Sequence, residues 1–142
     1  MRICIVDGQG GGIGKELVEK LKKVLSSDIK ITALGTNSAA TVIMLKAGAN
    51  EGATGENAIV YNANKADVIA GPLGIIMANS MMGELTPLMA RAISESDAYK
   101  VLIPISKCNA VVAGTEDISM PLLIDQAVED IAKRIKNRSQ HG

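Results

Sequence analysis

The hydrophobic pattern changes its period at a cluster of glycines near the start of the chain. Residues 3–6 form a continuous apolar run, Asp7 and a glycine-rich stretch follow, and apolar residues recur every four positions from Ile13 onward. A short β-branched run predicts a strand buried on both faces of a parallel sheet, whereas a four-residue period predicts an amphipathic helix. This segment is therefore predicted to form a strand, a glycine loop and a helix.

The alternation of strand and helix patterns continues to the end of the chain. Further strands are predicted at residues 29–34, 51–53, 68–70, 101–105 and 110–113. Further helices are predicted at residues 36–46, 56–64, 87–94 and 118–135. Thr36 or Asn37 can cap the second helix, and Thr86 can cap the helix that begins at Pro87. The apolar residues 73–83 fit either a buried strand or a loop.

Strands that alternate with helices predict an α/β fold. We expect a single doubly wound, mainly parallel sheet with helices on both faces, which is a Rossmann-like architecture. One such domain is expected over residues 1–137, with a disordered tail at residues 138–142. The last helix is expected to turn four side chains toward the sheet, namely Leu122, Val128, Ile131 and Ile135.

Composition excludes several classes of function. Fifteen basic and fifteen acidic residues cancel, and aromatic residues make up 1% of the chain, so neither a positive field nor base-stacking side chains support nucleic-acid binding. No apolar run approaches the length of a membrane span, so we expect no membrane association. The two cysteines form neither a disulfide framework nor a zinc pattern. We therefore expect a cytoplasmic protein without a metal site.

The glycine loop departs from the strict phosphate-binding patterns. Ile13 occupies the place of the third glycine in the dinucleotide fingerprint G-x-G-x-x-G, and the P-loop pattern fails at Gln9 and Glu16. The spacing G-x-x-x-G-I-G at residues 8–14 resembles the cofactor loop of short-chain dehydrogenases. That resemblance covers the first strand, loop and helix alone. The chain is too short to include the catalytic half of that family, so membership is rejected.

Small and polar residues follow four of the predicted strands. Ligands bind at the carboxyl ends of the strands in open parallel sheets, and glycine amides beside a helix N-terminus can hold an anion. We therefore expect a crevice for a nucleotide or another phosphorylated ligand at this edge of the sheet. Its candidate contacts are Asp7, Gly8, Gln9, Gly10, Gly11, Gly12, Ile13, Gly14, Thr36, Asn37, Gly71, Pro72 and Asn79.

Several of these candidates have competing interpretations. Asp7 would repel a nearby phosphate, so it either caps the local turn, which is the preferred role, or holds a ribose hydroxyl or a metal ion. Thr36 and Asn37 either bind a ribose through neutral groups or cap the second helix. Lys107 and Cys108 are the catalytic candidates, because a cation beside a thiol lowers the thiol pKa. No histidine base accompanies them, so a structural thiol is the preferred alternative.

Four motifs carry a resemblance that spans most of the chain. The segments DGQGGGIGK, LGTN, GATGENA and PLGII occur in this order. In this respect the chain resembles a small bacterial family catalogued as a domain of unknown function. The resemblance implies a compact Rossmann-like domain and brings no established activity with it.

These observations leave three hypotheses about function. The leading one is a binding protein for a nucleotide, a dinucleotide such as NAD(P), or a phosphorylated metabolite. The second is a small enzyme that acts on a phosphorylated metabolite, with Lys107, Cys108 or Asp7 in catalysis. The third is an interaction subunit whose methionine-rich segment contacts another protein, or a second copy of the chain in a homodimer.

Overall fold

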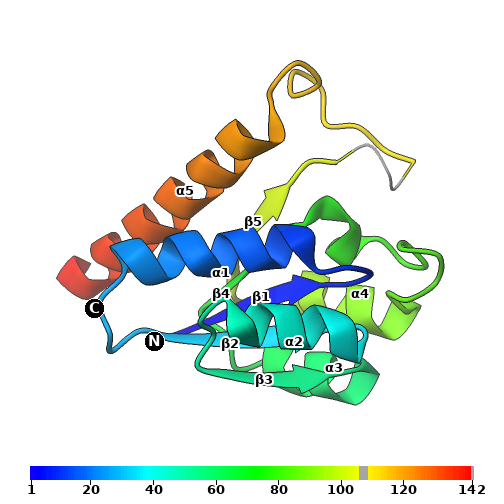
Figure 1. The fold of residues 1–142 in the computed structure, drawn as a ribbon, viewed down its shortest axis with the longest axis horizontal. Helices are drawn as coiled ribbons and strands as arrows, with labels where there is room; N and C mark the ends of the chain where they lie inside the picture. Colours follow the sequence, from blue (N-terminus) through cyan, green and yellow to red (C-terminus); the bar gives the residue numbers. More distant parts are fainter. Residues whose placement is uncertain (106–108, 142) are drawn as a thin grey trace.

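The computed structural model describes residues 1–105 and 109–141, and it contains one parallel sheet of five strands (Figure 1). The strands are β1 (Arg2–Asp7), β2 (Lys30–Gly35), β3 (Glu51–Thr54), β4 (Val68–Pro72) and β5 (Tyr99–Ile103). Their order in the sheet is β3-β2-β1-β4-β5. The chain therefore builds the sheet outward from β1 in one direction and then in the other. This is the doubly wound α/β fold that the sequence predicted, and its switch point lies between β1 and β4.

The described residues also contain five α-helices and one short 3-10 helix, of which all but the last helix connect strands. They are α1 (Gly12–Val24), α2 (Ser38–Lys46), α3 (Glu56–Ala63), η1 (Leu73–Ile76), α4 (Pro87–Glu95) and α5 (Met120–His141). Buried residues of α1, α2 and α5 belong to one core layer, and those of α3 and α4 belong to the other. Helices therefore cover both faces of the sheet. None of the described helices has the length and apolar character needed to cross a membrane.

The side chains of β1 divide the core into these two layers. Ile3 and Ile5 pack in the layer of α1, whereas Cys4 and Val6 pack in the layer of α3 and α4. All four side chains are at most 1% exposed, which explains why the strand reads as a continuous apolar run. Burial of a large aliphatic side chain contributes about 1.5–3 kcal/mol, so β1 is held firmly from both sides. This packing fixes the position of Asp7, the last residue of β1.

The structure corrects the prediction for the segment after β5. Residues 110–113 form no strand, and Val111 and Val112 are exposed. A β-branched run is typical of a strand, but it needs a neighbouring strand with which to pair. β5 is the edge strand of the sheet, and residues 110–113 pair with no described strand beyond it. The segment instead belongs to the connection between β5 and α5.

The last helix also differs from its prediction in two ways. Leu122, which was expected to face the sheet, is 61% exposed, whereas Ile124 is fully buried. Two residues along a helix correspond to a rotation of about 200°, so these two side chains point in nearly opposite directions. The helix also continues to His141, so residues 138–141 are helical where a disordered tail was expected. Arg138 Nη1 lies 2.8 Å from Asp67 Oδ1 and ties this end to the sheet.

Candidate functional site

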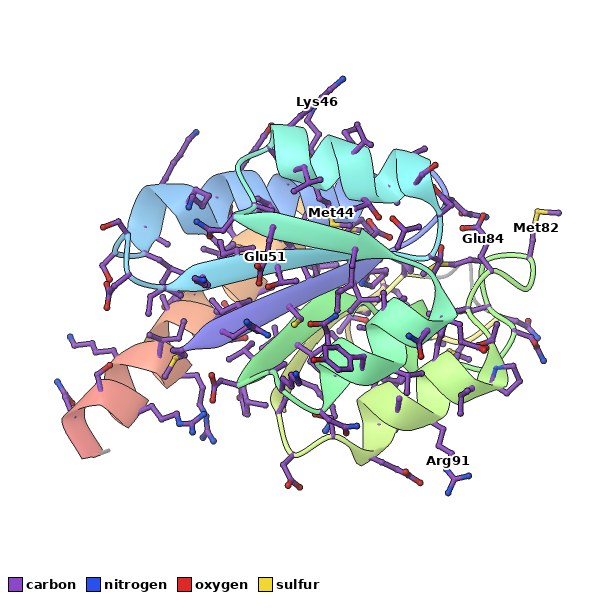
Figure 2. All side chains as sticks on the ribbon, turned by 90° about the horizontal axis from the view of Figure 1, so that it is seen from below. Met44, Lys46, Glu51, Met82, Glu84 and Arg91 are labelled. Carbon is purple, nitrogen blue, oxygen red and sulfur yellow. The ribbon has the colours of Figure 1, made fainter. Side chains whose placement is uncertain are left out.

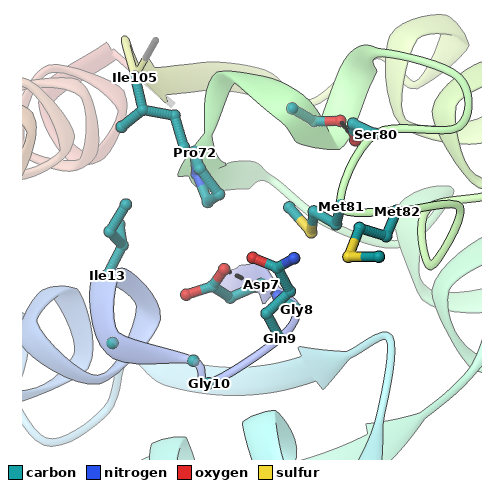
Figure 3. Close-up of a pocket in the computed structure, with 13 residues that line it drawn as sticks. Asp7, Gly8, Gln9, Gly10, Ile13, Pro72, Ser80, Met81, Met82 and Ile105 are labelled. Carbon is teal, nitrogen blue, oxygen red and sulfur yellow. Dashed lines mark hydrogen bonds between the residues drawn. The ribbon is translucent and has the colours of Figure 1, made fainter. Parts of the chain in front are cut away.

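A cavity of about 520 Å³ lies at the carboxyl ends of β1 and β4, where the order of the strands reverses (Figure 3). It lies between the glycine loop, residues 8–14, and the methionine loop, residues 77–86, which joins η1 to α4. Its lining residues are Asp7, Gly8, Gln9, Gly10, Gly11, Gly12, Ile13, Pro72, Gly74, Ser80, Met81, Met82 and Ile105. The structure thus brings residues 7–13 and Pro72, which were candidates from the sequence, to one cavity.

Asp7 ends β1 and caps the beginning of α1. Its Oδ1 accepts a hydrogen bond from the Gly8 N–H and its Oδ2 accepts one from the Gly14 N–H, both at 2.7 Å. Gly11 is the residue directly before α1, and it has no side chain that could cap the helix. Asp7 supplies the missing acceptor instead. Burial raises the pKa of Asp7, the Gly14, Gly8 and Ile13 amides offset part of this rise, and the charge of Glu84 raises the pKa further. The cavity therefore has a buried carboxylate at its base.

The hydrogen bonds of the glycine loop leave two of its amides without an acceptor. Asp7 accepts from the Gly8 and Gly14 N–H groups and also interacts with the Ile13 N–H, and the Gly11 N–H donates to the Gly8 carbonyl oxygen at 2.9 Å. Within residues 1–105 and 109–141, the N–H groups of Gly10 and Gly12 donate to no acceptor. Gly12 opens α1, where the first N–H groups have no partner in the helix itself. These two amides are the ones left to bind a ligand.

The glycines of the loop differ in what the fold requires of them. At Gly8 a Cβ atom would lie 2.5 Å from the Thr36 Oγ1, and Gly11 has a left-handed φ of 70°. A side chain is excluded at the first position and strained at the second. A Cβ at Gly10 or Gly12, in contrast, would meet no atom within 4 Å, and neither residue has a positive φ. The fold itself therefore does not require glycine at these two positions.

Glu84 of the methionine loop joins the loops that follow β1 and β2. Its Oε1 accepts hydrogen bonds from Gln9 N at 2.9 Å, from Thr36 Oγ1 at 2.7 Å and from Asn37 Nδ2 at 2.8 Å. The Gln9 amide, followed by the Thr36 hydroxyl, lowers the pKa of Glu84. The sequence offered no sign of this role, because the partners lie 47 to 75 residues away along the chain.

Thr36 and Asn37 do not line the cavity. Both side chains bind Glu84, and the Asn37 Oδ1 also accepts from the Ala40 N–H at 2.9 Å and so caps α2. The Asn37 Nδ2 donates in addition to the Gln9 carbonyl oxygen at 3.0 Å. Of the two caps that the sequence left open, Thr36 and Asn37, the structure uses Asn37. The hydrogen-bond donors of both side chains are thus already used within the protein.

Three further candidates, Gly14, Gly71 and Asn79, also lie outside the cavity lining. At Gly71 a Cβ would lie 2.2 Å from the Val6 carbonyl oxygen, so glycine allows β4 to pack beside β1. Asn79 has a left-handed φ of 66°, and its N–H donates to the Leu85 carbonyl oxygen at 2.8 Å. Gly71 and Asn79 therefore shape the neighbouring strand and loop.

The methionine loop forms an apolar wall of the cavity beside the start of the glycine loop. Residues 73–83, which fitted a strand or a loop, form η1 followed by turns. Met81 and Met82 have φ values of 58° and 56°, which are uncommon for residues other than glycine. Met81 and Met82 line the cavity next to Gly8 and Gln9 (Figure 3), a Cβ at Gly8 would lie 2.6 Å from the Met81 Sδ, and Met82 is 97% exposed. The Ser80 hydroxyl donates to the Gly74 carbonyl oxygen at 2.5 Å and anchors the wall to η1.

The described part of the site offers recognition groups rather than a nucleophile and its base. Lys107 and Cys108 lie outside the described residues. Both carboxylate oxygens of Asp7 accept hydrogen bonds from the chain itself. Residues 1–105 and 109–141 contain no group of three or more side chains suited to hold a metal ion. Backbone amides beside an apolar wall are the arrangement that remains.

A family match covers nearly the whole chain. Residues 2–136 match the family described as "Domain of unknown function (DUF3842)". The chain belongs to this family. The resemblance inferred from the four sequence motifs is thereby confirmed, and the DUF3842 match includes all five strands and both loops of the cavity.

No curated protein is significantly similar to this DUF3842 domain. One similar solved structure is the crystal structure of a dodecameric FMN-dependent UbiX-like decarboxylase from Escherichia coli O157:H7. It aligns over 96% of this chain and 95% of that chain, with 10% sequence identity and a TM-score of 0.44. At this level of similarity we draw nothing from it about ligand or assembly.

Proposed function

We propose that this domain binds a nucleotide or another phosphorylated small molecule in the cavity between the glycine loop and the methionine loop. The observation that carries the proposal is the pair Gly10 and Gly12. Their N–H groups have no acceptor among the described residues, and a Cβ at either position would enter open space. Glycine loses more backbone freedom on folding than any other residue, and the contacts of the fold give no reason for it at these two positions. A phosphate bound to these amides would be such a reason, because it needs close approach to the backbone.

The electrostatics of the loop favour an anion at its outer part. The positive end of the α1 dipole points toward Gly12, and exposed N–H groups at a helix N-terminus attract phosphate. The Asp7 carboxylate already occupies the Gly8 and Gly14 amides and repels a second anion there. Because this repulsion grows with the charge of the ligand, a phosphodiester with one charge fits better than a terminal phosphate with two.

The size and lining of the cavity agree with a small organic ligand. Its volume of about 520 Å³ lies within the range of about 300–1,000 Å³ that is typical of ligand pockets. Ile13, Pro72 and Met81 provide apolar surface beside the glycine amides. An anionic group on the amides and an apolar body against these side chains would use both parts of the cavity.

The first test is ligand-induced stabilisation. A ligand that binds the folded state alone raises its stability by RT ln(1 + [L]/Kd), which corresponds to about 2.7 kcal/mol at a concentration of 100 Kd. We expect at least one of NAD(H), NADP(H), ATP, FMN and coenzyme A to raise the melting temperature. If none of these compounds shifts the melting temperature, the proposal is wrong.

The substitution Gly12→Asp separates binding from folding. It places a carboxylate at the first position of α1, where negative charge stabilises a helix by about 0.3–1 kcal/mol, but this charge repels phosphate. Because repulsion from Asp7 offsets part of this gain, we expect an unliganded melting temperature close to that of the wild type and no ligand-induced rise. Asn57→Asp is the matched control, since it adds the same charge to the first turn of α3, in the other core layer. A full ligand-induced rise in Gly12→Asp would contradict the proposal.

A further inference from the structure

Glu84 is the point at which three separate segments of the chain meet. One carboxylate oxygen accepts from the Gln9 amide of the glycine loop and from the Thr36 and Asn37 side chains that follow β2. Glu84 itself belongs to the methionine loop, which forms the other wall of the cavity. Figure 2 shows Glu84 beside Met82 at one end of the molecule. A single side chain thus links both walls of the cavity and the neighbouring strand end.

The conformation of Gln9 depends on this link. Gln9 has a φ of 49°, a left-handed value that costs a residue other than glycine about 1–3 kcal/mol. Its N–H donates to Glu84 and its carbonyl oxygen accepts from the Asn37 Nδ2. Both backbone groups of Gln9 are therefore held in place. Because Gln9 lies directly before Gly10, this arrangement also sets the direction of the first amide assigned to the ligand.

Glu84 is also fixed within the methionine loop, which forms the other wall of the cavity. Glu84 follows Met82 by two residues, and its N–H donates to the Met81 carbonyl oxygen at 3.1 Å. Met81 and Met82 are both in the left-handed conformation, so the turn that precedes Glu84 is tight. Movement of the Glu84 side chain away from Gln9 would therefore detach the methionine loop from the glycine loop and change the width of the cavity.

We propose that Glu84 is a positioning residue for the ligand site. It holds the glycine loop and the methionine loop at the separation that the ligand requires. It acts by geometry, through one oxygen atom that accepts three hydrogen bonds, rather than by contact with the ligand. The inference rests on the proposed function, because it assigns Glu84 a role in binding at that cavity.

The test compares Glu84→Ala with Glu84→Gln, using the same compounds, NAD(H), NADP(H), ATP, FMN and coenzyme A, as probes in titration calorimetry. Alanine removes the acceptor of three hydrogen bonds, so the affinity for any probe that the wild type binds should fall by about tenfold or more. Glutamine keeps an oxygen in the same place without the charge, and its affinity should stay within about threefold of the wild type. Glu19→Ala is the control, since Glu19 is an exposed residue of α1 without a described partner.

Hydrogen exchange gives a second readout that needs no ligand. In Glu84→Ala the Gln9 amide should exchange faster, whereas the Gly14 amide, which Asp7 holds, should keep its wild-type rate. If Glu84→Ala does not fold, Thr36→Val removes one of the three donors and should lower the affinity by about threefold.

Each outcome distinguishes this inference from the proposed function. Wild-type affinity in Glu84→Ala, or an unchanged Gln9 exchange rate, overturns the role of Glu84 and leaves the proposed function intact. Equal losses in Glu84→Ala and Glu84→Gln show that charge matters rather than position, which also overturns it. A wild-type protein that binds none of the probes contradicts the proposed function, and the role of Glu84 in binding then fails with it.

Discussion

Asp7 holds two amides of the glycine loop from the end of β1, and Glu84 holds a third from the methionine loop. The two carboxylates thereby hold three amides of the loop, and the proposed function assigns the Gly10 and Gly12 amides to the ligand. The sequence indicated Asp7, because it stands at the boundary between a buried strand and a glycine run. It did not indicate Glu84, because an isolated carboxylate in a loop carries no periodic or spacing signal.

Substitution of Asp7 should change stability and binding in opposite directions. Asp7→Ala leaves the buried Gly8 and Gly14 amides without an acceptor, so the free energy of unfolding should fall by about 1–3 kcal/mol. Asp7→Asn keeps one acceptor oxygen and should lose less stability, while removal of the charge should strengthen the binding of a phosphorylated ligand. Urea denaturation and titration calorimetry measure the two effects. Weaker binding by Asp7→Asn would contradict the repulsion assigned to this carboxylate.

The pH dependence of the same pair of proteins tests the titration of Asp7. Because the pKa of Asp7 is raised in the folded state, the folded chain holds this proton more tightly than the unfolded chain. The stability of the wild type relative to Asp7→Asn should therefore fall as the pH rises through the folded pKa of Asp7. Ligand affinity should fall over the same range, since the ionised carboxylate repels phosphate. Parallel pH profiles for the two proteins would count against this account.

At the scale of elements, the hydrophobic pattern predicts a strand or helix well when neighbouring elements bury that strand or helix completely. The apolar run at residues 3–6 lies within β1, because that strand is the centre of the sheet and is buried on both faces. The valines at residues 111 and 112 misled the prediction, because the same residue types occur in an exposed connection beyond the edge strand. In α5, apolar residues occupy more than one helix face, and the pattern alone does not say which face meets the sheet.

A pair of alanine substitutions tests the orientation of α5. Ile124 is fully buried, so Ile124→Ala should lower the free energy of unfolding by about 2–5 kcal/mol. Leu122 is 61% exposed, and Leu122→Ala should change the free energy of unfolding by less than about 0.5 kcal/mol. Chemical denaturation of both variants measures the difference. Equal losses would show that Leu122 packs against the sheet, as the sequence pattern alone predicted.

At the scale of the whole molecule, the site is assembled from segments that are distant along the chain. The order of strands and helices predicted the fold and located one wall of the cavity, because ligands bind at the carboxyl ends of parallel strands. The sequence also indicated residues 79 and 80 as part of a wall of the cavity, but the conformation of that wall was not predictable, since residues 73–83 have no clear period and depend on hydrogen bonds to distant residues. Thr36 and Asn37 illustrate the same limit, because their partner Glu84 lies 48 and 47 residues away.

The central claim is that the Gly10 and Gly12 amides hold the phosphate of a ligand, and backbone NMR of the wild-type protein tests it most directly. The compound with the largest thermal shift would be titrated while the amide signals of the glycine loop are followed. The account predicts the largest shifts at Gly10 and Gly12 and smaller ones at Gly8 and Gly14, which Asp7 already holds. Saturation with ligand while the Gly10 and Gly12 signals stay in place would contradict it.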